Sequence, residues 1–137
     1  YALSAGKKSP KRNISVSRII YLADSEQDAI DDLRASVAYE TSVQNQRGFL
    51  EMLKNLYGLE VPNNETAIDS YVESGYYILG DSNTVTEKLK KFYDESGGFG
   101  TLLIVTGKDW ATREKRANSM RLFMEQVAPK LRHLDPK

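Results

Sequence analysis

The chain has 137 residues, of which 40% are hydrophobic and 28% charged, enough for one modest core but not for two domains. Lys plus Arg total 19, as do Asp plus Glu, so the net charge of +0 gives no general attraction for nucleic acid or anionic lipid. With no cysteine and a single histidine, disulfides, cysteine nucleophiles and zinc clusters are excluded.

The sequence shows neither a membrane-helix pattern nor a signal-peptide pattern. The longest uncharged apolar run, residues 99–106, is much shorter than the roughly 20 residues of a membrane helix, and no signal-peptide pattern opens the sequence. We therefore expect a soluble, cytoplasmic protein. Because the chain begins at Tyr1, we interpret it as a piece of a longer protein. Residues 1–13 are basic and predict a flexible leader, with a phosphate-binding arm as the alternative, ahead of one domain over 14–137.

The first half of the domain predicts one strand followed by helices. Residues 14–22 are rich in β-branched side chains, which is typical of a strand. Ser25 is suited to cap a helix from about Glu26 to Tyr39. The helical pattern continues over 41–58, where Gly58 is suited to end it, and a short helix is expected near 67–72.

The second half alternates strands and helices. Residues 76–79 predict a strand, and the spacing of apolar residues over 85–93 predicts an amphipathic helix. The apolar run 99–106 is expected to be a strand covered on both faces. A long helix follows from about Thr112 to Leu131, and Pro129 should kink or terminate it.

This order predicts an α/β fold in which βα units share a parallel sheet. Three strands alone leave two sheet edges and one face uncovered. A closed barrel of eight such units needs about 250 residues. The length therefore matches only the last three or so βα units of a TIM barrel, which are incomplete on their own.

The segments that follow the strands are the candidate sites, because βα folds place their catalytic face there and helix N-termini bind anions. Gly80 permits close approach of a ligand to the backbone, and the hydroxyl and amide groups after it suit a phosphate or a flavin edge. The predicted cofactor-binding residues are Gly80, Asp81, Ser82 and Asn83. The alternative is ordinary capping of the next helix by Asp81, Asn83 or Thr84.

Trp110, the only tryptophan, follows the last strand, and it and Lys108 are the predicted substrate-pocket residues, with the indole as one wall of the pocket. Packing of Trp110 against the final helix is the alternative. The glycine-rich segment 97–100 enters a strand instead of opening a helix, so we interpret it as a structural turn, and His133 as a surface residue. The sequence contains no metal-ligand pattern and no nucleophile elbow, so any chemistry needs a cofactor.

Several segments together resemble the C-terminal part of the bacterial luciferase-like flavin monooxygenases, in the branch of limonene and alkanal monooxygenases. They are YILGDSNTV (77–85), EKL (87–89), GGFGTLL (97–103), DWA (109–111), SMRLF (119–123) and VAP (127–129). Residues 16–29 also fit, so the similarity spans about 14–132. In the family a proline usually stands where this chain has Ser82.

The resemblance implies a TIM-barrel enzyme that binds reduced FMN, or alternatively FAD or a deazaflavin, often supplied by a separate flavin reductase. With O2 such an enzyme oxygenates a small organic substrate. The family's main flavin contacts and catalytic groups lie on earlier strands, so we expect activity only in the complete barrel, and this piece alone to be inactive. Family geometry would turn 80–83 and 107–110 toward the flavin or the substrate.

Two other hypotheses stay open. The chain could be a non-catalytic, self-associating module whose open strand edges pair with another copy, which would make it a homo-oligomer. It could also belong to a deazaflavin-dependent oxidoreductase of the same superfamily, which transfers hydride and does not use O2.

Overall fold

The computed structural model describes residues 10–134. Residues 1–9 of the predicted leader lie outside this range, and the following segment forms a short 3-10 turn, η1 (Lys11–Asn13). The remaining elements are β1 (Ser15–Leu22), α1 (Glu26–Asn45), α2 (Phe49–Tyr57), α3 (Ala67–Glu73), β2 (Tyr77–Gly80), α4 (Ser82–Glu95), β3 (Thr101–Val105), α5 (Arg113–Leu122), the π-helical segment η2 (Phe123–Val127) and α6 (Ala128–Leu131).

The three strands form one open parallel sheet in the order β2-β1-β3. The first half of β1 pairs with β3, from Ser15 opposite Thr101 to Ile19 opposite Val105. The second half pairs with β2, from Ile19 opposite Tyr77 to Leu22 opposite Gly80. The predicted parallel α/β sheet is confirmed, and β1 lies between the two strands that follow it in the sequence.

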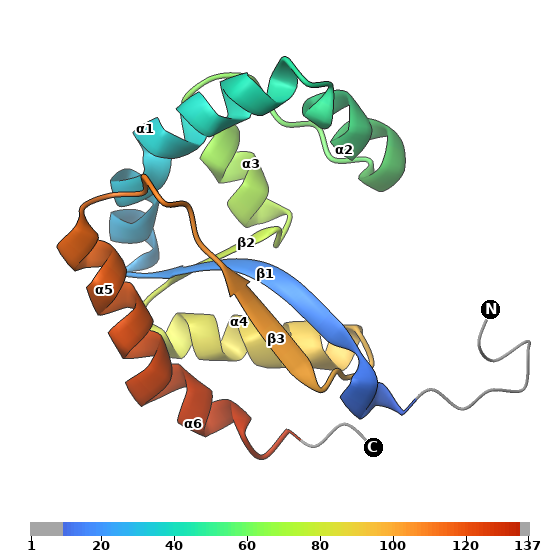
Figure 1. The fold of residues 1–137 in the computed structure, drawn as a ribbon, viewed down its shortest axis with the longest axis vertical. Helices are drawn as coiled ribbons and strands as arrows, with labels where there is room; N and C mark the ends of the chain where they lie inside the picture. Colours follow the sequence, from blue (N-terminus) through green and yellow to red (C-terminus); the bar gives the residue numbers. More distant parts are fainter. Residues whose placement is uncertain (1–9, 135–137) are drawn as a thin grey trace, which may run out of the picture.

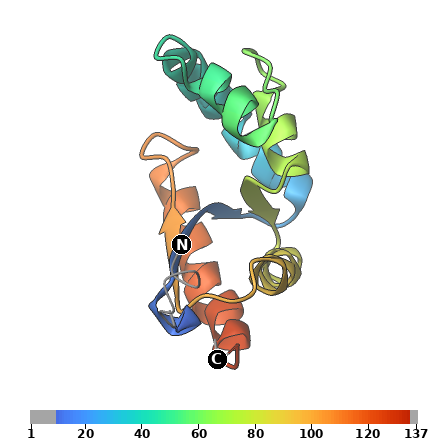
Figure 2. The same ribbon diagram turned by 90° about the vertical axis from the view of Figure 1, so that its right-hand side faces the viewer.

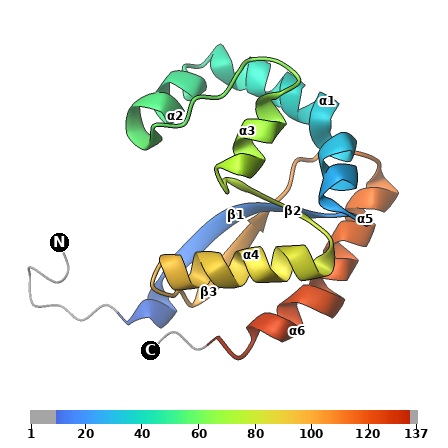
Figure 3. The same ribbon diagram turned by 180° about the vertical axis from the view of Figure 1, so that it is seen from behind.

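Helices cover the two faces of the sheet (Figure 1). Alternate side chains of β1 point to opposite faces, so Tyr21 packs with α1 and α3 while Ile20 packs with α4 and η2. The view in Figure 2 separates these layers, with α1 to α3 on one side of the sheet and α4 to α6 on the other. Figure 3, the view from behind, shows α4 lying across this second face of the sheet. Two hydrophobic clusters result, with β1 contributing to both.

The strand β3 corrects one expectation. It was predicted to be covered on both faces, but its residues alternate between exposed and half-buried. Leu102 and Ile104 pack against the cluster with α4 and η2, whereas Leu103 is 61% and Val105 41% exposed. The reason is that α1 and α3 lie over β2 and the second half of β1, which leaves the same face of β3 uncovered.

The helices are longer or more divided than predicted. The first runs to Asn45 instead of Tyr39, and Gly48 in a left-handed conformation then separates α1 from α2, so 41–58 is not one helix. The expected single helix 112–131 is divided into α5, η2 and α6. The amide of Ala128 bonds to the carbonyl of Phe123, five residues back, just ahead of Pro129. The wider turn lies where proline, which lacks an N–H, disturbs the α-helical ladder.

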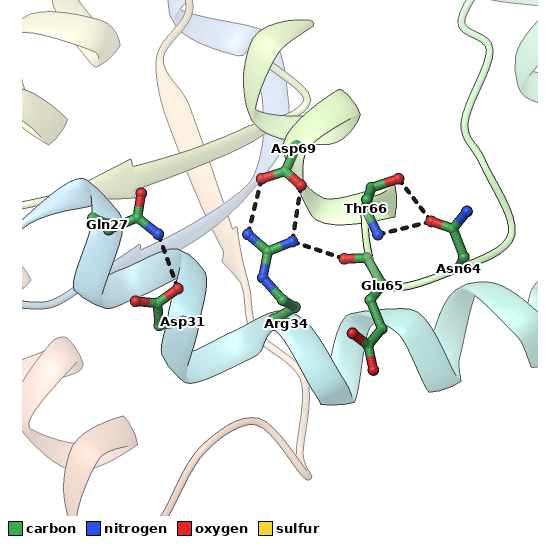
Figure 4. A network of polar contacts seen from close by, with 7 residues as sticks. All are labelled: Gln27, Asp31, Arg34, Asn64, Glu65, Thr66 and Asp69. Atoms are coloured by element: carbon green, nitrogen blue, oxygen red, sulfur yellow. Dashed lines mark hydrogen bonds and ion pairs between the residues drawn. The ribbon is translucent and has the colours of Figure 1, made fainter.

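Polar contacts hold α3 against α1 (Figure 4). The Arg34 guanidinium makes two hydrogen bonds to the Asp69 carboxylate, at 2.8 and 3.1 Å, and a third to the carbonyl of Glu65 at 2.9 Å. The Asn64 side chain accepts from the Thr66 amide at 2.8 Å, one residue ahead of α3. The pKa of Asp69 is lowered, chiefly by the hydrogen bond from Arg34. These bonds fix the start of α3.

The glycine-rich segment is the structural turn that the sequence predicts. Gly98 donates its amide to the carbonyl of Tyr93 and ends α4. Gly100 lies so close to the backbone carbonyl of Arg12 that a Cβ atom there would be 1.9 Å from the oxygen. The segment therefore brings β3 against β1. His133 is exposed, as expected.

The register of β1 and β3 can be tested by oxidation, because the natural sequence has no cysteine. Ser17 lies opposite Leu103, and both side chains are exposed on the uncovered face. We expect the double variant Ser17→Cys/Leu103→Cys to form an intramolecular disulfide, detected as the loss of two hydrogens in the intact mass. The control pair Ser17→Cys/Leu102→Cys places its thiols on opposite faces and should stay reduced. Equal cross-linking of both pairs would contradict the register.

Candidate functional site

The segments that follow β1 and β2 lie together at the carboxyl edge of the sheet. The amide of Ala23, directly after β1, donates to the carbonyl of Gly80 at the end of β2, at 3.1 Å. Trp110, after β3, contacts the ring of Tyr77, with centroids 5.7 Å apart. In βα folds this edge carries the ligand sites.

Gly80 and Asp81 form a closely packed helix start. Gly80 has a φ of +144°, and a Cβ atom there would lie 2.9 Å from the Thr84 methyl carbon. The Asp81 carboxylate accepts the amides of Asn83 and Thr84 at 2.8 and 3.0 Å and the Thr84 hydroxyl at 2.8 Å. These bonds, the one from the Thr84 amide above all, lower the pKa of Asp81. Asp81 is thus the N-cap among the three candidates.

Ser82 and Asn83 are also held by protein groups. Ser82 is buried, and its carbonyl accepts the Thr86 hydroxyl at 2.6 Å. The Asn83 side-chain oxygen accepts from the Lys130 ammonium at 2.9 Å. A carboxylate therefore stands where the helix N-terminus would attract a phosphate, and it already accepts the amides of Asn83 and Thr84. Cofactor binding by residues 80–83 stays a prediction that requires Asp81 to release its contacts.

The two predicted substrate-pocket residues lie in different environments. Trp110 is only 2% exposed and belongs to the cluster with α1 and α3. Its indole nitrogen donates to the Glu40 carboxylate at 3.0 Å, and its carbonyl accepts from Arg116 at 2.7 Å. Lys108 projects outward, its side chain 90% exposed and 3.9 Å from Asp109. Trp110 thus packs mainly on α1 and Tyr77, with α5 reaching only its backbone; a role for either residue toward substrate remains a prediction.

The structure adds a polar cavity of about 270 Å³ at the end of β1. The Tyr21 hydroxyl donates to Asp32 at 2.9 Å, and Lys115 of α5 makes an ion pair with the same carboxylate. Burial, followed by the bond to Asp32, raises the pKa of Tyr21, so its hydroxyl stays protonated. Other walls are Asp24, Asp28, Asp31 and Asn118. Asp32 has two donors already and is held in place rather than available as a base.

Sequence reasoning missed this group of residues. In the sequence pattern Tyr21 is one more residue of a predicted strand, and Asp32 is one of several acidic residues in the first part of a predicted helix. Lys115 lies 83 residues from Asp32, and no periodicity connects them. In the same region the hydroxyl of Ser119, on α5, accepts the buried amide of Leu22 at 2.8 Å. The ion pair from Lys115 to Asp32 and the bond from Leu22 to Ser119 bring α1, β1 and α5 together at this point.

Two further findings concern residues 10–134 only. No three His, Cys, Asp or Glu side chains there are grouped to hold a metal ion. Over the same range, none of the helices is both long and apolar enough to cross a bilayer.

Comparison with known proteins gives partial matches, and no family model matches the sequence. The chain is 25% identical to limonene 1,2-monooxygenase of Rhodococcus erythropolis over 130 residues, which are 93% of this chain and 31% of that protein. It is 26% identical to 4-hydroxyprotoasukamycin monooxygenase of Streptomyces nodosus subsp. asukaensis, covering 94% of this chain and 33% of the relative. The chain spans about a third of the length of the curated relatives it matches.

Two solved structures show a similar fold. One is the oxygenating constituent of 3,6-diketocamphane monooxygenase of Pseudomonas putida, a type II Baeyer-Villiger monooxygenase in complex with FMN. It is 21% identical with a TM-score of 0.67, covering 94% of this chain and 36% of that one. The other is a monooxygenase of Streptomyces bottropensis, 23% identical with a TM-score of 0.60, covering 93% and 34%. At these identities the likeness establishes the fold alone.

The helix start at Gly80 gives a stability test. Gly80→Ala adds a Cβ atom in a conformation that only glycine adopts readily and next to the Thr84 methyl group, so we expect a loss of about 3 kcal/mol in the free energy of unfolding. Gly75→Ala is the matched control, because Gly75 has a φ of +74° with no atom within 4 Å of the added Cβ. It should lose only about 1 kcal/mol. Urea unfolding followed by circular dichroism measures both, and equal losses would contradict the packing at Gly80.

Proposed function

We propose that this chain, a partial match to the luciferase-like flavin monooxygenases, supplies the last βα units of the TIM barrel of such an enzyme. The complete cytoplasmic enzyme would use reduced flavin and O2 to oxygenate a small organic substrate, with a separate flavin reductase as its partner. The observation that carries the proposal is that curated monooxygenases align over more than nine-tenths of this chain.

The open sheet agrees with a barrel in the direction of its strands and in the cover of its faces, but not in its strand order. A barrel of βα units places strands that follow one another in the chain side by side, in the order β1-β2-β3, whereas here β1 pairs with both β2 and β3. Helix α4 and segment η2 cover one face of β1 and β3, and the other face is uncovered along Ser17, Leu103 and Val105. A barrel likewise has helices outside and side chains of the inner face packed in layers. The missing strands would cover the exposed face.

The flavin would be held by the complete barrel. Bound reduced flavin supplies the electrons and the reaction with O2 that the side chains of this chain lack. The residues of the turn 80–83 do not fit the flavin phosphate as arranged, because the Asp81 carboxylate occupies the helix N-terminus. We therefore propose that the turn shapes the carboxyl edge of the barrel, with Trp110 as a rigid support beneath it.

A binding experiment tests the flavin proposal. Reduced FMN is titrated without oxygen into the longer protein that contains this chain and into the 137-residue chain, with fluorescence of Trp110 and of the flavin as readouts. We expect stoichiometric binding by the longer protein and none by the 137-residue chain. Failure of the longer protein to bind FMN would overturn the proposal, and binding of a deazaflavin alone would favour the oxidoreductase of the same superfamily.

A charge variant in the longer protein tests the role of the turn. Asp81→Asn keeps a capping side chain but removes the negative charge. If residues 80–83 hold the flavin phosphate, the affinity for FMN should rise severalfold. An unchanged affinity would show that the turn only caps α4.

A second proposal, self-association of the 137-residue chain, is favoured by β3. This strand has five residues, Thr101–Val105, with no charge and no proline, on the outer edge of the sheet. Such an edge readily pairs with another strand. In the complete barrel the edge of β3 would pair with another strand of the same protein. The first proposal therefore concerns the complete enzyme, and the second concerns the 137-residue chain by itself.

Sedimentation velocity at several concentrations tests the second proposal. We expect a concentration-dependent dimer that Leu103→Lys abolishes, because a lysine on an exposed edge strand opposes pairing. The matched control is Leu56→Lys, on α2, where the side chain is 68% exposed compared with 61% for Leu103. A monomer at all concentrations, or equal effects of both variants, would exclude pairing through β3.

A further inference from the structure

Arg18 lies at the opposite end of the sheet from the predicted sites. It lies in the first half of β1, on the face covered by α4. Its guanidinium carbon is 3.7 Å from the centroid of the Phe92 ring, and one terminal nitrogen donates to the carbonyl of Ser17 at 2.9 Å. Stacking on an aromatic ring and a backbone bond thus fix the guanidinium in one orientation.

One donor of this guanidinium has no partner. Nε of Arg18 is buried, and it is the one buried side-chain nitrogen or oxygen without a hydrogen bond in the described range 10–134. Arg18 also makes no ion pair with any residue of that range. Burial lowers the pKa of Arg18, although the group stays charged. Arg18 as a whole is half-buried, so its charge is partly solvated, and a bound anion would supply the counterion that the described residues do not provide.

A cavity of about 520 Å³ adjoins this side chain. Phe92 and Tyr77 give it aromatic surface, and Val72 and Ile78 give it aliphatic surface. The turn after α3, at Ser74, adds polar groups. The volume lies within the range of small-molecule sites, which combine an apolar lining with a few fixed polar groups.

The charged groups around the cavity leave Arg18 as its uncompensated cation. Lys88 is paired with Glu26, and Lys91 with Glu95 at 3.7 Å. Glu73 lies on the wall without an ion pair among the described residues. Within residues 10–134, Arg18 is thus the cation of the wall that lacks a counterion and Glu73 the anion, so an anionic group is favoured next to Arg18.

We propose that this cavity binds a small organic anion, whose carboxylate or phosphate group contacts the Arg18 guanidinium and whose apolar part packs against Phe92 and Tyr77. An arginine fork donates hydrogen bonds to two oxygens of such a group, and the aromatic walls replace water around the rest of the molecule. The cavity lies at the amino end of β2, away from Gly80, so the proposal does not rest on flavin binding.

Phenyl phosphate is the probe that tests the site, added to the 137-residue chain with 15N-labelled arginine. We expect saturable shifts of the Arg18 Nε–H signal in heteronuclear NMR spectra. Inorganic phosphate, which lacks the apolar part, should bind at least tenfold more weakly, and benzyl alcohol, which lacks the charge, should not shift the signal. Arg18→Lys should weaken binding of phenyl phosphate severalfold, because lysine keeps the charge but loses the fork.

One variant and one control residue separate the proposal from its competitors. Phe92→Leu should weaken the binding of phenyl phosphate and have little effect on the binding of inorganic phosphate. The circular dichroism spectrum shows whether the variant is folded. Arg47, which is exposed on the turn between α1 and α2, is the internal control, and its Nε–H signal should not move. Equal shifts at Arg47 and Arg18 would show nonspecific ion binding and overturn the proposal.

An internal partner for Arg18 would also overturn it. If Glu73 swings onto the guanidinium in solution, Glu73→Gln will shift the Arg18 Nε–H signal with no probe present. The absence of any shift with phenyl phosphate would likewise exclude the site, and would leave a carboxylate of an adjoining polypeptide segment as the partner to seek.

Discussion

The fold depends on β1, which pairs with a different strand along each half of its length and contributes side chains to a separate hydrophobic cluster on each of its faces. Its first half pairs with β3 and its second half with β2, so each neighbour meets only part of it. Consecutive side chains near its end, Ile20, Tyr21 and Leu22, are almost fully buried in alternate clusters. Every helix that covers the sheet therefore packs against side chains of this strand or of a strand paired with it.

The sequence predicts those features that depend on neighbouring residues. Ser25 caps α1 by accepting the Asp28 amide, as its place before the helix predicts, and Gly58 ends α2 in a left-handed conformation. The strands lie within two residues of their predicted ends. The strand order and the exposure of β3 could not be predicted in this way, because an apolar run shows that a strand can be buried, not which helices cover it.

The same distinction applies to the candidate site. A polar turn after a strand is a correct indication of a helix N-terminus, but a cap and a phosphate cradle use the same residue types, and the Asp81 carboxylate makes this turn a cap. The contacts of Trp110 with Glu40 and of Lys115 with Asp32 join residues 70 and 83 positions apart in the sequence. Such contacts follow from how the chain returns to α1 after β3, which no local pattern encodes.

The bond between the Leu22 amide and the Ser119 hydroxyl has a consequence for how the chain folds. The last buried donor of the first strand is satisfied by a helix 97 residues later. The partners of β1 are equally remote, since Ile19 pairs with Tyr77 and Val105. Loop closures of this length must precede the contacts that reward them, which slows folding. Among the three strands, β1 is made before both of its partners, so its second half stays unpaired until β2 has been made and its first half until β3 has been made, and in that interval its apolar side chains are open to aggregation.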